Sequence, residues 1–266
     1  DHFEQRQAFL QAQVDAWMAM FWWPYLRIFG VLIVEPFFSN NAIPVRVRVG
    51  FSILLAMLLA PNLGPLPQVA VVSPEGLLIV LRELLIGLSI GFVVRIVFST
   101  MEMAGQLSGL QMGLGFASFY DPQHAANTGI VAQFLGLFML LVFLAFNGHL
   151  IVLRALIESF VQLPISASLP GAGGMKLVAD YGSVIFRAGV MLSLPVLAAL
   201  LITNLAIGVM TRAAPQLNVF AIGFPITIAI GAAALYLSLP LLVPHIEAML
   251  ADMTRFFLKL MQAYGT

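Results

Sequence analysis

The chain has 266 residues, of which 61% are apolar and only 9% are charged, and its formal net charge is zero. Soluble domains carry about 25% charged residues, so a soluble fold of this composition would expose large apolar patches. The neutral charge gives no basic surface for nucleic acid, and the lack of cysteine excludes disulfides and thiolate metal sites. The composition therefore predicts a protein whose surface faces lipid, other protein chains, or both.

Apolar stretches suitable for membrane helices recur along the chain and predict a polytopic, all-α membrane protein. Met18–Val34 is the first of them. Val49–Pro74 predicts a short helix to about Ala60 followed by a proline-rich loop. Leu77–Phe98 is long enough to span a bilayer.

The remaining stretches are expected to form two helical pairs and an amphipathic tail. Thr128–Phe146 and Leu150–Leu163 are separated only by a short Asn-Gly break, which predicts an antiparallel hairpin. Ala188–Thr211 and Val219–Leu242 form the second pair. In Ile246–Leu260 apolar residues repeat at helical spacing with charged residues between them, which is typical of a helix with one buried face.

Charged residues and helix breakers lie inside these apolar stretches. Each charge would cost several kcal/mol if it were unpaired in hydrocarbon. Prolines kink helices, and glycines let backbones approach closely. Both features favour helices buried against other protein subunits, although an ordinary multi-span protein with kinked helices is the alternative. The charges are Arg27, Arg82, Glu83, Arg95, Arg154 and Arg187, and the breakers include Pro24, Gly87, Gly91, Pro195 and Pro225.

Arg82, Glu83 and Arg95 are the charges expected to be buried. Adjacent side chains on a helix point about 100° apart, so Arg82 and Glu83 do not face each other. A proton relay through this pair is one hypothesis. Separate pairing of each residue with another helix or subunit is the interpretation that the spacing favours.

A glycine-rich and methionine-rich segment, GLQMGLGFASFYDP, occupies positions 109–122. Dense glycine makes a helix unstable, and methionine is flexible enough to fill an irregular gap. The segment therefore predicts either a movable apolar constriction or a glycine-zipper helix packed in a bundle. Its candidate residues are Gly109, Leu110, Gln111, Met112, Gly113, Leu114, Gly115, Phe116, Phe119, Tyr120, Asp121 and Pro122.

Two further segments punctuate the C-terminal half. Residues 215–225 predict a tight, buried hairpin turn with Gln216 and Asn218 as helix caps, bracketed by Pro215, Gly223 and Pro225. Ser166–Lys176 is rich in glycine, proline and serine and predicts a linker. The chain is accordingly divided into residues 1–165, a linker at 166–183, and a helical hairpin with its tail at 184–266.

Motifs of catalysis and cofactor binding do not occur. The sequence has no phosphate-binding loop, no HExxH and no nucleophile elbow, and its histidines lack ligand spacing. We therefore expect a non-enzymatic protein with no catalytic residue, no metal and no cofactor.

Three phrases in order carry a family resemblance: GLQMGLGFASFYDP at 109–122, FLAFNGHL at 143–150 and TRAAPQLNVFAIGFP at 211–225. AIPVRVRVG at 42–50 and FWWPYLRIFG at 21–30 also fit. Together they resemble the FliR family of flagellar type III export-gate proteins, which is related to the injectisome export-gate subunit SctT.

The resemblance implies a subunit that assembles with FliP and FliQ around a secretion pore in the inner membrane, within the flagellar basal body. It implies tilted helical hairpins, a FliP-like part in residues 1–165 and a FliQ-like hairpin in 184–266. It also assigns the glycine-rich segment as the pore plug. Unfolded flagellar substrates, an FlhB-like export subunit and membrane lipid are the further implied partners, with no nucleic acid.

Other classes of function stay open from the residues alone. A secondary transporter with broken helices would use Arg82, Glu83 and Glu102 as a relay. An injectisome gate subunit or an assembly scaffold would share the same composition. The absence of two similar halves with matching helix breaks counts against the transporter.

Overall fold

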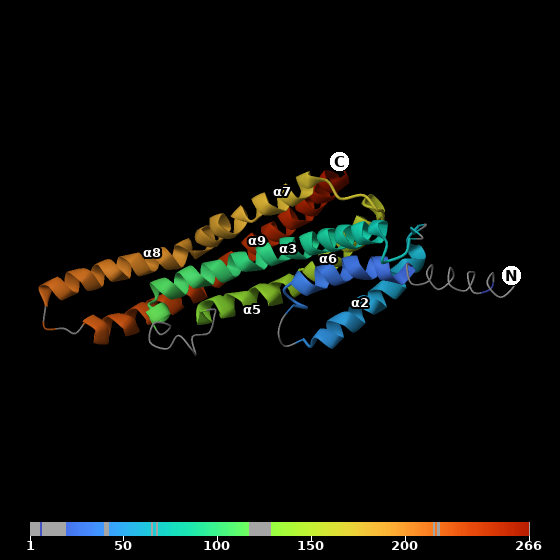
Figure 1. The fold of residues 1–266 in the computed structure, drawn as a ribbon. Helices are drawn as coiled ribbons and strands as arrows, with labels where there is room; N and C mark the ends of the chain where they lie inside the picture. The colour runs from blue at the N-terminus through green and yellow to red at the C-terminus, as the bar shows by residue number, and fades with distance from the viewer. Residues whose placement is uncertain are drawn as a thin grey trace. The chain divides into compact units, whose positions relative to one another are not determined.

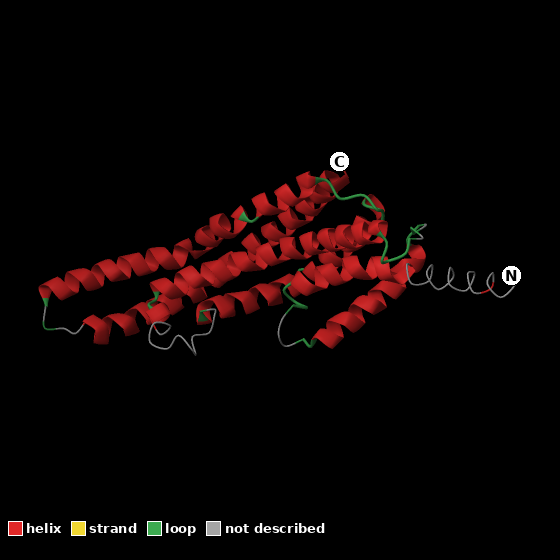
Figure 2. Ribbon diagram, in the orientation of Figure 1, coloured by secondary structure: helices red, strands yellow, loops and turns green. Residues whose placement is uncertain are grey.

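The computed structural model describes Arg6 and residues 20–39, 43–64, 66–67, 69–116, 129–214, 216 and 219–265. Within these ranges the protein is all-α, with no strand (Figure 2). A first helix, Met20–Val34, precedes the labelled elements. These are α2 (Val45–Leu59), η1 (Ala60–Asn62), α3 (Pro74–Gln111), η2 (Leu114–Phe116), α5 (Ile130–Ala145), α6 (Gly148–Gln162), α7 (Ala172–Tyr181), α8 (Ser183–Ala213) and α9 (Val219–Gly265) (Figure 1).

Among the described residues, four helical segments are long and apolar enough to cross a membrane, or five if α5 and α6 count as one broken span. This agrees with the expected polytopic, all-α membrane protein. Within the predicted linker at 166–183, residues 172–181 form helix α7 and residue 183 begins α8, so only residues 166–171 and 182 are non-helical.

The predicted antiparallel hairpin between α5 and α6 is wrong. The chain bends by 68° at the break and does not reverse. Phe146 closes α5 with a bond from its N–H to the carbonyl of Val142, and Asn147 adopts a positive φ of 56°. Because only this short break leaves the helical path before α6 begins, the turn falls short of a reversal.

Local capping sets the ends of α3. Ser73 accepts a hydrogen bond from the N–H of Gly76 at 3.0 Å, and Pro74 and Glu75 occupy the first turn. This is the arrangement expected of a serine N-cap with proline at the first helical position. At the other end Gly113, with φ of 86°, donates its N–H to the carbonyl of Leu110. A glycine with positive φ is a common way to end a helix.

The residues form two compact units, the first made of residues 1–95, 149–181 and 252–266 and the second of 96–148 and 182–251. In the first unit, Trp23, Leu26 and Ile79 form a buried cluster. The first helix packs on α3 at glycines, because a side chain at Gly87 would overlap the carbonyl of Arg27 and one at Gly91 would lie 2.6 Å from that of Val31.

The link between the first helix and α2 is held by polar contacts. Glu35 accepts a hydrogen bond from the N–H of Phe38 at 3.0 Å, and Phe38 stacks on Phe51 of α2. Burial raises the pKa of Glu35, while the hydrogen bonds from Phe38 and Phe37 lower it. Arg48 donates to the carbonyls of Ser39 and Ile43 and so fixes the start of α2.

The end of α9 completes the first unit. The hydroxyl of Tyr264 lies 2.5 Å from that of Ser89, and its carbonyl accepts from the N–H of Gly171. Phe256 stacks on Tyr181 with ring centroids 4.1 Å apart. The predicted amphipathic tail is confirmed: the apolar residues at helical spacing are buried or half-buried, while Glu247, Asp252, Arg255 and Lys259 are exposed. The inward residues are Ile246, Met249, Leu250, Met253, Phe256, Phe257 and Leu260.

The second unit packs by the same device. A side chain at Gly105 of α3 would lie 2.8 Å from the carbonyl of Val131 of α5. Gly189 of α8 faces Met103 and the carbonyl of Thr100. Phe98 and Phe143 meet edge to face at 5.2 Å. Glycine is therefore placed where helices approach most closely.

Gly87→Ala should destabilise the protein by about 1–3 kcal/mol, because the new methyl group meets rigid backbone of the first helix. Gly208→Ala on α8 is the matched control, since that glycine has open space around it and alanine favours helix by up to about 1 kcal/mol. Denaturant unfolding in detergent measures both. Equal effects of the two substitutions would show that the Gly87 contact is not tight.

Candidate functional site

The glycine-rich segment begins as helix and not as loop. Gly109, Leu110 and Gln111 form the last turn of α3, and the path turns only at Met112 and Gly113. Gly109 lies 3.5 Å, measured from a Cβ placed on it, from the side chain of Val131. The expectation that glycine density breaks the helix is therefore wrong for positions 109–111, because close packing on α5 stabilises it there.

Met112 is the anchor of the segment. Its side chain is 3% exposed and lies in a cluster with Val131, Val196 and Leu200. Its carbonyl accepts a hydrogen bond from the hydroxyl of Thr227 at 3.2 Å. Gly231 makes room for it, since a Cβ there would lie 2.5 Å from the Met112 Cγ. Thus α5, α8 and α9 all hold the end of α3.

Beyond Met112 the chain becomes more exposed. Leu114 packs against the Met112 cluster, and η2 ends at Phe116. Gly115 lies over the side chain of Leu110, 2.6 Å from a Cβ built on the glycine. Phe119, Tyr120, Asp121 and Pro122 lie outside the described residues.

The far end of the segment is also tied to α3. The N–H of Gly129, just before α5, donates to Oε1 of Gln106 at 3.3 Å. The segment between Met112 and Gly129 therefore starts and ends beside the last turns of α3. Sequence reasoning missed Gln106, Thr227 and Gly231, because nothing local marks a residue whose partner lies so far along the chain.

The predicted turn at 215–225 is shorter than expected. Gly223 and Pro225 lie inside α9, which begins at Val219. Gln216 is exposed, and Pro215 and Asn218 fall outside the described residues. Proline is tolerated in membrane helices when other groups satisfy the freed backbone. Nearby, the hydroxyl of Thr227 also lies 3.0 Å from the carbonyl of Phe224.

A buried ion pair is the second concentration of polar groups. Arg27 Nε and Nη2 donate to the two carboxylate oxygens of Glu83 at 2.6 and 2.9 Å, and both side chains are 0% exposed. Arg27 also donates to the carbonyl of Ser159 at 2.7 Å and that of Leu163 at 2.8 Å. Its guanidinium lies 4.3 Å from the centre of the Phe160 ring. A guanidinium with this many acceptors is fully satisfied.

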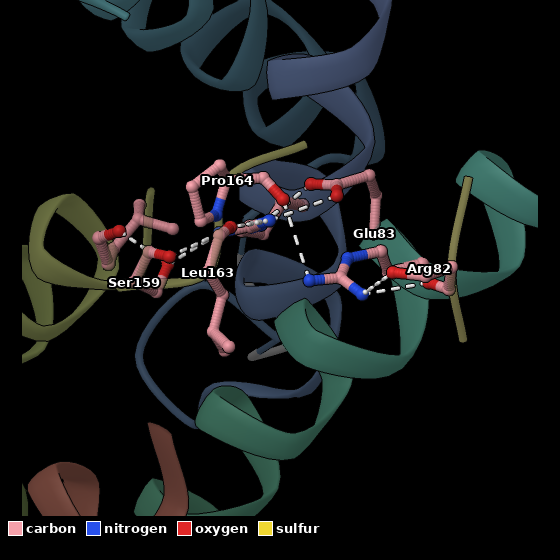
Figure 3. Close-up of polar contacts among 8 residues, drawn as sticks. Arg82, Glu83, Ser159, Leu163 and Pro164 are labelled. Atoms are coloured by element: carbon pink, nitrogen blue, oxygen red, sulfur yellow. Dashed lines mark hydrogen bonds and ion pairs between the residues drawn. The ribbon is translucent and has the colours of Figure 1, made fainter. Parts of the chain in front are cut away.

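Arg82 points to a different set of partners from Glu83 (Figure 3). It donates to the carbonyl of Ser168 at 2.7 Å, to its hydroxyl at 2.9 Å and to the carbonyl of Pro164 at 3.5 Å. These contacts hold the strap 163–168, which follows α6, against α3. Separate pairing of Arg82 and Glu83 is therefore what the structure contains.

The remaining predicted charge, Arg95, is half-buried and not fully buried. The transporter relay would need Glu102 as well as Glu83, and the two are about 28 Å apart along α3. Glu83 is already closed by Arg27. The geometry thus favours a structural role for these charges. Among the described residues, no group of three or more histidines or acids could hold a metal.

The comparisons with known proteins agree with one another. The model of the bacterial export proteins, family 1, matches residues 18–253. The flagellar biosynthetic protein FliR of Pectobacterium carotovorum is 40% identical over 89% of this chain and 90% of its own length. The chain belongs to the FliR family. FliR of Escherichia coli is 36% identical over the same shares, and that of Bacillus subtilis is 29% identical over 77% of this chain and 80% of its own length.

The residues that match the family include both the buried ion pair and the start of the glycine-rich segment. The matched region runs from the first helix through the Arg27–Glu83 pair and the Met112 anchor to the middle of the α9 tail. The chain is thus a FliR-family export protein with several membrane-spanning helices.

Glu83→Leu should destabilise the protein by about 3–5 kcal/mol, because it leaves the Arg27 guanidinium buried without a counter-charge. The double variant R27M/E83L should recover most of the loss, since both charges are then gone. Unfolding in detergent, analysed as a double-mutant cycle, measures the coupling.

Asp252→Ala provides the matched control for this cycle. It breaks an exposed pair with Arg255 and should cost less than about 1 kcal/mol. If Glu83→Leu costs no more than Asp252→Ala, the buried pair does not hold the first unit together.

Proposed function

We propose that this FliR-family chain is a non-catalytic subunit of the flagellar type III protein-export gate, in the inner membrane at the flagellar basal body. It lets unfolded flagellar proteins cross without a leak of ions. The observation that carries the proposal is the anchored Met112 stem, from which the glycine-rich segment extends, in a member of an export family.

The partners are FliP-like and FliQ-like gate subunits and an FlhB-like export subunit. Large apolar side chains remain exposed along α8 and α9, where lipid or other chains must cover them. They include Met191, Leu194, Leu201, Ile202, Leu205, Val209, Tyr236, Leu237 and Leu241. In this proposal residues 1–165 are the FliP-like part, and 184–266 are the FliQ-like hairpin that meets the neighbouring hairpins.

Residues 109–122 act as the pore plug. The stem is fixed at Met112, and Gly113 turns the chain out of α3 with a backbone angle that suits glycine. The segment beyond it is apolar, with Leu114, Phe116 and Phe119. An apolar constriction can block ions by dewetting, and it offers a passing chain no strong binding site.

Co-expression tests the proposed assembly. The chain expressed alone should elute as a mixture of oligomers in mild detergent, because its exposed apolar helices lack partners. The chain co-expressed with FliP and FliQ should elute as one stable complex in size-exclusion chromatography. A monodisperse, folded monomer that ignores both partners would contradict the proposal.

Deletion of Leu114–Phe119 tests the plug. It keeps Met112 and Gly113, so the complex should assemble at normal yield, while cells should admit small dyes and ions through the gate. Dye entry, divided by the amount of assembled complex, is the measurement. Normal assembly with no added leak would show that the segment only packs.

A pair of methionine variants separates anchoring from stability. Met112→Ala and Met139→Ala each remove a buried methionine of the second unit and should cost about 2–5 kcal/mol. Only Met112→Ala should raise dye entry, because Met139 lies on α5 away from the stem. Equal dye entry through both variants would show that lower stability of the second unit causes the leak, and not loss of the Met112 anchor.

A further inference from the structure

An apolar groove runs along the first unit between the first helix and α2. Its volume is about 800 Å³, and its wall is almost wholly apolar. The first helix supplies Phe21, Trp22 and Tyr25, and α2 supplies Ile53, Ala56 and Met57. Trp22 stacks on Tyr25 with centroids 5.7 Å apart, which gives one wall a continuous aromatic surface. The export mechanism described above makes no use of this groove.

The face of α2 that lines the groove continues to a single positive charge. Arg46, Gly50, Ile53 and Met57 follow each other at spacings of four, three and four residues, so they share one face of the helix. Gly50 has no atom within 4 Å of a Cβ built on it, so the path from Arg46 to Ile53 is open. The groove therefore continues along α2 to one positive charge, Arg46, at its end.

Arg46 is placed to meet an anionic headgroup. It is exposed in the first turn of α2, and side chains on a helix lean toward its N-terminus, away from the groove. Long basic side chains at helix ends reach to the membrane interface in this way. The distance from Arg46 to Met57 along the helix is about 16 Å, close to the ~15 Å depth of one leaflet's hydrocarbon. Arg48, by contrast, is engaged with the carbonyls of Ser39 and Ile43.

We propose that this groove binds one anionic phospholipid, with an acyl chain along Gly50, Ile53 and Met57 and the phosphate at Arg46. A partner helix fits the lining less well. Helix contacts in membranes are made at small residues that let backbones approach, whereas aromatic and larger aliphatic side chains make up most of this lining. Ala56 in the groove and Gly50 on the path to it are the small residues among those named. A flexible lipid acyl chain can follow an uneven surface of this kind. The inference does not depend on the export function.

Photolabelling tests the proposal on the full chain, alone and co-purified with FliP and FliQ. The protein is placed in nanodiscs of phosphatidylethanolamine with a fifth of a probe, either phosphatidylglycerol or phosphatidylcholine, each with a diazirine in its acyl chain. Mass spectrometry locates the label. Phosphatidylglycerol should label the peptides around Trp22 and Met57 about fivefold more than phosphatidylcholine, from one basic contact near the membrane surface.

Matched variants assign the headgroup and tail contacts. Arg46→Gln should abolish the preference for phosphatidylglycerol, and Arg212→Gln, an exposed arginine on α8, should leave it unchanged. Gly50→Leu should reduce labelling by both probes by blocking the path, whereas Gly208→Leu, which also faces open space, should not. Circular dichroism confirms that each variant keeps its helices.

Three outcomes would overturn the proposal. Equal labelling by the two probes in the native sequence would show that Arg46 does not select an anionic headgroup. Unchanged labelling in Gly50→Leu would place the acyl chain elsewhere. Loss of label from the groove when FliP and FliQ are present, with a partner peptide cross-linked there, would show that a protein helix fills it. None of these outcomes bears on the gate function, which the leak assay tests separately.

Discussion

A guanidinium and a carboxylate that are buried together in an apolar unit must bond to each other, because neither group can reach water. Arg27 and Glu83 do so through two parallel bonds, and the remaining donors of Arg27 reach carbonyls of Ser159 and Leu163 at the end of α6. One arginine thus joins the first helix, α3 and α6. The free-energy cost of burying charge makes this arrangement selective: a shift of any of the three helices leaves a charge or a carbonyl unpaired. Arg82 extends the same scheme to the strap 163–168.

Glycine makes that network geometrically possible. The carbonyl of Arg27 lies directly over Gly87, one turn along α3 from Glu83, so any side chain at position 87 would push the first helix outward. The ion pair needs the close approach, and the close approach needs glycine. The two features occur together because membrane helices gain little from apolar contact alone and associate through tight backbone packing and polar bonds. The second unit repeats the device with Gly105 and Gly189, although it has no buried ion pair among its described residues.

Sequence patterns predicted the features that depend on local chemistry. Apolar stretches located the helices, the spacing of Ile246, Leu250 and Met253 identified the buried face of the tail, and adjacency showed that Arg82 and Glu83 must find separate partners.

The predictions that failed depended on contacts between residues far apart in the chain. The partner of Glu83 lies 56 residues away and that of the Met112 carbonyl 115 residues away, and no local signal encodes either. Glycine density at 109–111 predicted a loop because helix propensity alone takes no account of the close contact with Val131 that stabilises the helix. Pro225 predicted a turn, whereas it lies inside α9, as proline is tolerated in membrane helices.

In the proposed plug, the Met112 stem is the fixed part and Gly113 is the joint. Its fixed part is buried among α5, α8 and α9 and bonded to Thr227, so force on the segment is transmitted to several helices at once. The next residue, Gly113, is the first of α3's end to leave the helical region, and its positive φ carries no steric cost. Rotation about that residue therefore leaves the helix before it in place and moves Leu114, which packs against the Met112 cluster. Because Gly129 is bonded to Gln106, both ends of the segment are attached to α3, which limits how far the proposed plug can move. The proposed gate function requires a plug that reseals after each substrate, and these contacts supply it with an anchor at Met112, a joint at Gly113 and a second attachment at Gly129.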